Sequence, residues 1–113
     1  MAEPLSVRER ITAIANRLIP GNTDPNEIAS FELSLVGLRW LVSLEVVASE
    51  LSYRHAVLDV TSQTTASGRE QVAKGTAAYA RWLEAEATLD TVTEMLRTCR
   101  SNIRLQTEAA RRG

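Results

Sequence analysis

The sequence predicts an all-α fold, in which a short N-terminal helix precedes a long antiparallel helical hairpin of the coiled-coil type. Three observations predict it. Helix-capping side chains stand three residues before a glutamate at three places, and apolar residues then recur at helical spacing. Opposite charges also meet when the two long helices are folded back on each other. With 113 residues, the chain has the length of one domain, which we expect to cover residues 1–113.

Capping pairs set the predicted helix starts. The three pairs are Ser6 with Glu9, Asp24 with Glu27 and Ser67 with Glu70. In each pair the first side chain can accept a hydrogen bond from a backbone N–H of the first turn, and the glutamate can accept one in return. Pro25 suits the first position of a helix, and Pro20-Gly21-Asn22 forms a turn before it. We therefore expect helices over about residues 7–19, 25–63 and 68–111.

The first and third predicted helices each carry one apolar stripe, the pattern of a helix that packs on one side. In the first helix the stripe consists of Val7, Ile11, Ile14 and Leu18. In the third it follows a heptad repeat. One core position of the repeat holds Trp82, Leu89, Leu96, Ile103 and Ala110. The other core position holds Ala85, Val92, Cys99 and Gln106.

The second predicted helix carries two apolar stripes. We expect the third helix to cover the stripe made of Leu33, Trp40, Leu44, Val47, Leu51 and Leu58. The other stripe consists of Phe31, Leu35, Leu38, Val42, Val46, Tyr53 and Val60. Because the first helix spans only ~20 Å, it leaves part of this second stripe without a cover.

That uncovered part predicts an interface, because a contiguous exposed apolar strip normally marks one. The predicted interface of a homo-oligomer consists of Val42, Val46, Tyr53, Val57 and Val60. The alternative is that the first helix lies further along, or that the hairpin bends, so that the strip is buried within one chain.

Charged residues fix the expected alignment of the hairpin. If the turn lies near residues 64–67, the numbers of two facing residues add up to about 132. Charged residues that flank the core of a coiled coil help to set such an alignment. Five opposite-charge pairs then meet: Asp59–Lys74, Glu50–Arg81, Arg39–Glu94, Glu32–Arg100 and Glu27–Arg104.

The end of the third predicted helix is basic, although the chain as a whole has a net charge of −1. The cations concerned are Arg97, Arg100, Arg104, Arg111 and Arg112. Such a row can follow a phosphate backbone, which predicts binding of nucleic acid or of another anionic partner. The row can also arise without any anionic partner. Arg100 and Arg104 have predicted partners in the hairpin, and cations are favoured near any helix C-terminus.

No catalytic, cofactor or metal site is predicted. His55 has Asp59 one turn further on but no nucleophile, and we interpret it as a surface or interface residue. Cys99 falls at a core heptad position, where we expect a small buried thiol. Glu86, Asp90 and Glu94 form an acidic row that we interpret as a solvated face.

A resemblance adds an expectation about origin. Glu50 to Tyr53, Ala66 to Glu70, Ala85 to Ala87 and Arg100 to Gln106 resemble segments of small helical-hairpin proteins of actinobacterial phages and prophages. Genes of that group often lie near recombination functions, and the resemblance implies no site residues.

Together these features predict a non-enzymatic accessory protein of a phage or mobile element, cytoplasmic in a bacterial host. It is expected to form a homo-oligomer and to bind a protein partner. A nucleic-acid-binding accessory of recombination, and a structural component of a virion, are the alternatives. No segment of the sequence is apolar for long enough to predict a membrane span.

Overall fold

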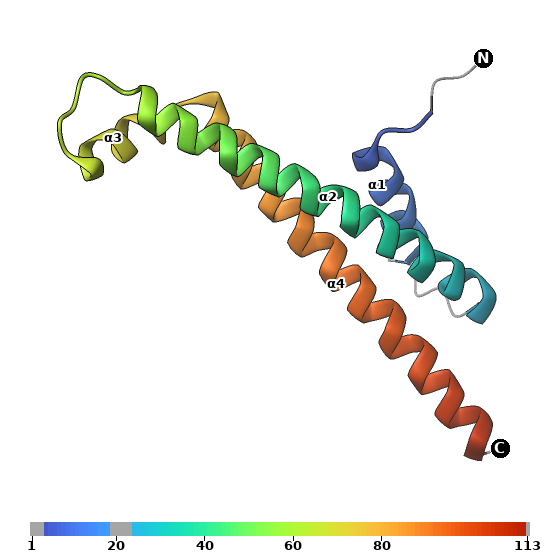
Figure 1. Ribbon diagram of the computed structural model, residues 1–113. Helices are drawn as coiled ribbons and strands as arrows, with labels where there is room; N and C mark the ends of the chain where they lie inside the picture. Colours follow the sequence, from blue (N-terminus) through green and yellow to red (C-terminus); the bar gives the residue numbers. More distant parts are fainter. Residues whose placement is uncertain (1–3, 19–23, 113) are drawn as a thin grey trace. The chain divides into compact units, whose positions relative to one another are not determined.

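The computed structural model describes residues 4–18 and 24–112, and every regular element in these ranges is an α-helix (Figure 1). The helices are α1 (Val7–Leu18), α2 (Pro25–Asp59), α3 (Ala66–Ala73) and α4 (Ala77–Arg112). The predicted all-α class is confirmed. The chain divides into two compact units, and the division falls within both long helices. The expectation of one domain over residues 1–113 stays a prediction.

Two of the three predicted helix starts are correct. The backbone N–H of Glu9 donates to the Ser6 hydroxyl (3.2 Å), and the backbone N–H of Ser6 donates to Glu9 Oε1 (3.5 Å), which is the reciprocal capping arrangement. Asp24 Oδ1 accepts from the backbone N–H of Asn26 (3.0 Å), and α2 begins at Pro25. The predicted end of the first helix at residue 19, and the Pro20-Gly21-Asn22 turn, lie outside the described residues.

The third predicted helix is wrong as a single element. The structure has α3 and α4 in its place, separated at Lys74, Gly75 and Thr76. Thr65, not Ser67, caps the start, because its hydroxyl accepts from the backbone N–H of Gly68 at 3.0 Å. At the break, the Gly75 N–H donates to the Val72 carbonyl, and the Thr76 hydroxyl donates to the Ala73 carbonyl at 2.6 Å. A glycine followed by a β-branched residue is a weak point in a helix, and these tighter bonds replace the regular ladder there.

The second predicted helix ends at Asp59 rather than at residue 63. The segment that follows, Thr61 to Thr64, consists of threonine, serine and glutamine. Hydroxyl side chains compete for backbone hydrogen bonds, which makes such a run a poor continuation of a helix.

The first unit, Met1–Leu41 with Thr91–Gly113, contains α1, the first part of α2 and the last part of α4. Its core takes side chains from all three helices: Ile11, Ile14, Ile28, Leu35, Leu38, Val92, Leu96 and Cys99. The predicted α1 stripe is therefore confirmed at its centre. Glu32 accepts from Arg100 Nε at 3.2 Å, which confirms the predicted antiparallel pairing of α2 with α4 in this unit.

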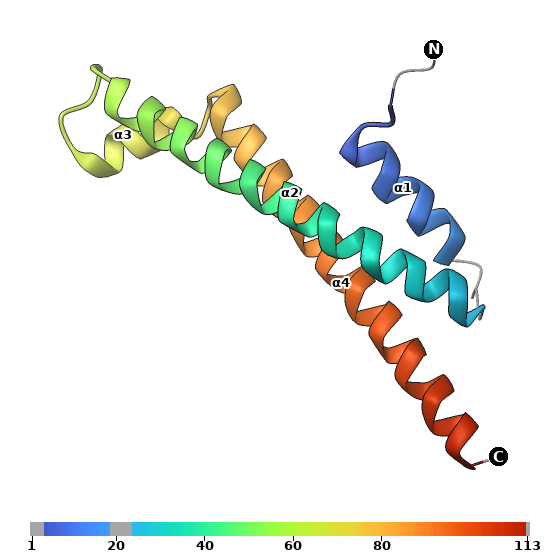
Figure 2. The same cartoon turned by 45° about the vertical axis from the view of Figure 1, so that its right-hand side comes forward.

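The second unit, Val42–Asp90, contains the end of α2, α3 and the beginning of α4, which lie side by side in both views (Figures 1 and 2). Three aromatic rings join α2 to α4. The Tyr53 ring lies 5.2 Å from the rings of Tyr79 and Trp82, centroid to centroid. Ser49 is fully buried in the same stripe of α2, and its hydroxyl is satisfied there because it donates to the Glu45 carbonyl at 2.7 Å.

None of the other four predicted ion pairs of the hairpin, Asp59–Lys74 included, forms among the described residues, and three of their carboxylates pair with other arginines. Arg81 pairs with Glu45 at 2.7 Å instead of with Glu50, and Glu50 instead accepts from Arg54 one turn away. Glu27 pairs with Arg17, and Glu94 with Arg97. Each of these pairs is exposed, so each contributes little to stability.

The assignment of the two α2 stripes is reversed relative to the prediction. Leu35, Leu38 and Val42 are buried, whereas Leu33 is 78% exposed and Trp40 is 67% exposed. The predicted interface is therefore not an uncovered strip. Val42 and Tyr53 are buried and Val46, Val57 and Val60 are half-buried within the single chain. The reason is that α2 is apolar on two sides, so its own periodicity cannot decide which side α4 covers.

The matching core on α4 is confirmed along most of its length. Ala85, Val92, Leu96 and Cys99 are buried, and Trp82, Leu89, Ile103 and Gln106 are half-buried. Ala110, the last predicted core residue, is exposed.

The stripe assignment predicts a large difference between two leucine truncations in the first unit. Leu38→Ala should lower the free energy of unfolding by about 2–5 kcal/mol, because it empties a buried site. Leu105→Ala, at an exposed position of α4, should change it by less than about 0.5 kcal/mol. Chemical denaturation of both variants measures this. Equal losses would contradict the assignment of the core.

Candidate functional site

The exposed face of α2 carries an unbroken series of residues at heptad core spacing. This α2 seam consists of Leu33, Gly37, Trp40, Leu44, Val47, Leu51, Arg54 and Leu58. All eight are exposed. Alternating steps of three and four residues are the spacing of a helix surface that packs against one other helix in a coiled coil. The sequence pattern contained this stripe, but sequence reasoning placed it against the third helix.

Charge is scarce beside the α2 seam. The positions on its two sides hold Ser34, Val36, Leu41, Ser43, Ala48, Glu50, His55 and Val57. The Glu50 carboxylate is paired with the Arg54 guanidinium at 3.0 Å, so the seam's own cation is already neutralised on this face. At Gly37 an added Cβ would meet nothing within 4 Å, which leaves a gap in the seam between two large side chains.

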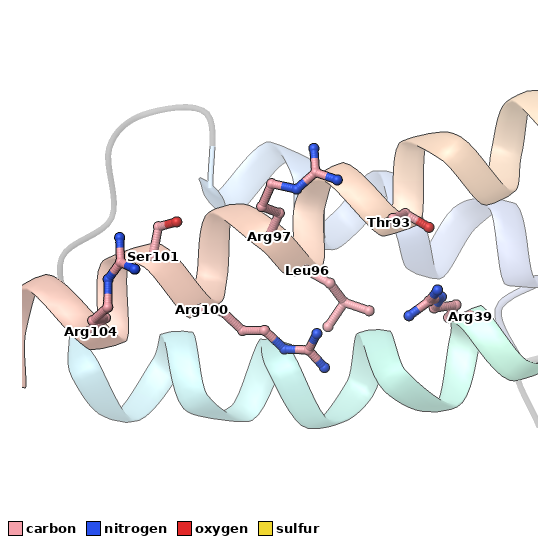
Figure 3. Close-up of a pocket in the computed structure, with 7 residues that line it drawn as sticks. All are labelled: Arg39, Thr93, Leu96, Arg97, Arg100, Ser101 and Arg104. Atoms are coloured by element: carbon pink, nitrogen blue, oxygen red, sulfur yellow. The ribbon is translucent and has the colours of Figure 1, made fainter.

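The second candidate is a pocket in the first unit. It has a volume of about 290 Å³ and is lined by Arg39, Thr93, Leu96, Arg97, Arg100, Ser101 and Arg104. Figure 3 shows Arg39 on α2 and the other six residues on α4. The two helices run in opposite directions here. The buried Leu96 gives the pocket an apolar part. The structure thus brings together Arg97, Arg100 and Arg104 of the predicted basic row.

Arg39 belongs to this pocket and was missed as a binding residue, because the sequence offered Glu94 as its partner. In the structure Glu94 pairs with Arg97 on its own helix. Arg111 and Arg112 do not line the pocket and lie further along α4, in its last turn. The predicted antiparallel alignment could have identified Arg39, because it places Arg39 opposite Thr93, which also lines the pocket.

Other residues considered from the sequence lie apart from these two surfaces or at their edge. His55 is exposed on α2. Glu86, Asp90 and Glu94 are exposed as expected, and within residues 4–18 and 24–112 no group of three metal-binding side chains comes together. None of the described helices is both long and apolar enough to cross a membrane.

Cys99 is buried, as predicted from its heptad position. Burial raises the pKa of its thiol, and the nearby Glu32 carboxylate raises it further. Both effects oppose formation of the reactive thiolate.

We predict slow labelling of Cys99 in the folded chain. At neutral pH a thiol reagent should react at least about ten times more slowly than with the unfolded chain, because the thiol is both covered and protonated. A chain with Cys99→Ser and Leu105→Cys supplies the control, since it moves the single thiol to an exposed position of the same helix. Equally fast labelling of both folded chains would contradict burial of Cys99.

The Glu45–Arg81 pair predicts a pH dependence of stability. Hydrogen bonds from Arg81 hold the pKa of Glu45 below its ordinary value in the folded chain. The unfolded chain therefore takes up the proton first as the pH falls. The pair stabilises the fold above the ordinary carboxyl pKa, and this contribution is lost as the pH falls through the lowered pKa.

Accordingly, Glu45→Gln should lower Tm slightly at neutral pH, and the difference should shrink as the pH falls through the lowered pKa of Glu45. Glu86→Gln, at an exposed position of α4 in the same unit, should show a difference that hardly varies with pH. Thermal melts of the two variants and the parent chain, between neutral pH and about pH 3, measure these differences in Tm. A Glu45→Gln difference that grows on acidification would show that the pair does not stabilise the fold.

Comparisons with known proteins identify no relative of this chain. Neither protein-family models, nor curated proteins, nor solved structures give a match to the chain. The two candidate surfaces therefore stand on their geometry and chemistry.

Proposed function

We propose that this chain is a non-enzymatic binding protein whose first partner is a second copy of itself, joined through the α2 seam. The observation that carries the proposal is the exposure of the seam: Leu33, Trp40, Val47 and Leu58 are each more than 60% exposed. Large apolar side chains in one contiguous row are unfavourable in water, and each Leu or Val gains ~1.5–3 kcal/mol when it is fully buried.

A second copy is favoured because the seam is complementary to itself when two α2 helices run antiparallel. In the register centred between Glu45 and Val46, Leu33 of one copy meets Leu58 of the other, and Leu44 meets Val47. Trp40 meets Leu51. All three are apolar pairs, and the seam extends over ~37 Å, almost four heptads, which is enough for a stable coiled coil.

The one charged residue of the α2 seam also has a place in this register. Arg54 of one copy meets Gly37 of the other, where the space above the backbone is open. The aliphatic part of an arginine can pack in such a gap while its head group stays paired with Glu50.

The residues beside the seam fit the same register. Val36 of one copy lies beside Val57 of the other, and Leu41 lies beside Ala48 of the other copy. Apolar residues are therefore next to apolar ones across the interface. Ser43 lies opposite Glu50, and no two like charges face each other. Since both copies contribute the same surface, the contact closes on itself as a two-fold dimer.

The place of such a dimer in the cell is a further part of the proposal. A role as a cytoplasmic accessory protein of a phage or mobile element rests on the resemblance of Glu50 to Tyr53, Ala66 to Glu70, Ala85 to Ala87 and Arg100 to Gln106. A further protein partner would then bind the dimer rather than the single chain.

The solution mass tests the dimer. A chain of 12.4 kDa should elute with twice that mass in size-exclusion chromatography with light scattering. Leu44→Glu and Leu51→Glu should each return the mass to that of one chain, because a charge would be buried in the seam. Leu105→Glu makes the same change at an exposed leucine outside the seam and should leave the dimer intact.

Circular dichroism should show unchanged helix content in all three variants. A Leu44→Glu chain that keeps the dimer mass would contradict the seam as the interface. Mass that keeps rising with concentration would contradict a closed dimer and favour the structural role in assembly.

The orientation is tested by disulfide formation. In the antiparallel register, chains with Leu44→Cys should form disulfides with chains carrying Val47→Cys when the two are mixed, since these positions face each other. Cys99 is buried and does not interfere. Disulfides between two Leu44→Cys chains alone would instead indicate parallel helices.

A further inference from the structure

We propose that the arginine pocket of the first unit binds the phosphodiester backbone of a nucleic acid. The inference concerns a different surface from the α2 seam and does not depend on the dimer. It starts from four arginines that line one small hollow, one from α2 and three from α4: Arg39, Arg97, Arg100 and Arg104.

The charges around the pocket do not cancel. Glu94 is paired with Arg97, and Glu32 with Arg100 at 3.2 Å. Within the described part of the chain, no carboxylate pairs with Arg39 or Arg104. The pocket therefore holds about two positive charges in excess, although the whole chain has a net charge of −1. An anion from outside the chain is the group that would relieve this repulsion.

The donors suit phosphate in particular. A guanidinium presents several N–H groups in a planar fork that matches two phosphate oxygens at once. The Ser101 side chain, half-buried at the wall of the pocket, adds a hydroxyl donor. The volume of about 290 Å³ is small for a drug-sized ligand and fits a compact group such as a phosphate.

A polymer is favoured over a single phosphate because the basic residues continue along α4. From Arg97 to Arg111 the helix axis rises ~21 Å, so the row is several times longer than one phosphate. A linear polyanion can contact Arg39 and Arg104 in the pocket and Arg111 beyond it. The contacts are to the backbone, which predicts binding that depends strongly on salt and weakly on base sequence.

The test is fluorescence anisotropy with a labelled short DNA duplex, titrated with the full chain between about 50 and 200 mM salt. The parent chain should bind with an affinity that falls steeply with salt. The double variant Arg39→Gln/Arg104→Gln should bind about tenfold or more weakly at the lowest salt. Its slope of log affinity against log salt should be shallower by about 1.8, that is 0.9 for each lost phosphate contact.

A matched control removes the same two charges elsewhere. Arg10→Gln/Lys74→Gln changes exposed cations that do not line the pocket, and it should keep the affinity and slope of the parent chain. If both double variants lose affinity equally, the attraction is a general charge effect and the pocket proposal is overturned. Absence of salt-dependent binding by the parent chain overturns it as well.

Two competitors separate the sources of anionic charge. Unlabelled duplex should displace the probe, whereas inorganic phosphate and poly-glutamate at the same concentration of negative charge should not. Displacement by phosphate alone would show a site for a single anion, and displacement by poly-glutamate a site for acidic protein; either result overturns the proposal. The Leu44→Glu chain should bind the probe through the same arginines, which separates failure of this site from failure of the dimer.

Discussion

The packing of one apolar stripe of α2 against α4 is the contact on which the other features depend. In the first unit it buries Leu35 and Leu38, and in the second it stacks Tyr53 on Trp82. A helix can present only one side to one neighbour. Once this stripe faces α4, the α2 seam faces away from it, and Arg39 comes to lie beside the arginines of α4. The apolar surface and the basic pocket are thus two consequences of one choice of face.

Polar interactions accommodate the packing of this α2 stripe on α4 and do not determine it. Glu32 and Glu45 flank the buried stripe and find Arg100 and Arg81 on α4, but both pairs are exposed and exposed ion pairs stabilise a fold only slightly. Ser49 can lie in the core because its hydroxyl bonds to its own helix. The Trp82 indole N–H, in contrast, is buried without a partner among the described residues, so its ring contacts must outweigh this cost.

The two proposed surfaces differ in chemistry. The α2 seam is apolar and almost uncharged, as the centre of a protein interface is. The pocket is basic and open to a polyanion. A two-fold dimer carries two pockets, and two weak contacts to one duplex reinforce each other when both can be made at once.

The sequence by itself determined the helical class, the starts of α1 and α2, and most of the core of α4. Each of these follows from local rules: capping pairs such as Ser6 with Glu9, and one apolar stripe per helix. It also identified Arg97, Arg100 and Arg104 as a group. The end of α3 at Ala73 was missed because a glycine lowers helix stability without abolishing it. Only the tertiary structure decided which α2 stripe is buried, and therefore that the seam of Leu33 to Leu58 is exposed and that Arg39 joins the pocket. Two stripes of similar hydrophobicity give the same helical periodicity, so the difference between them lies in how the side chains fit α4, which no local pattern records.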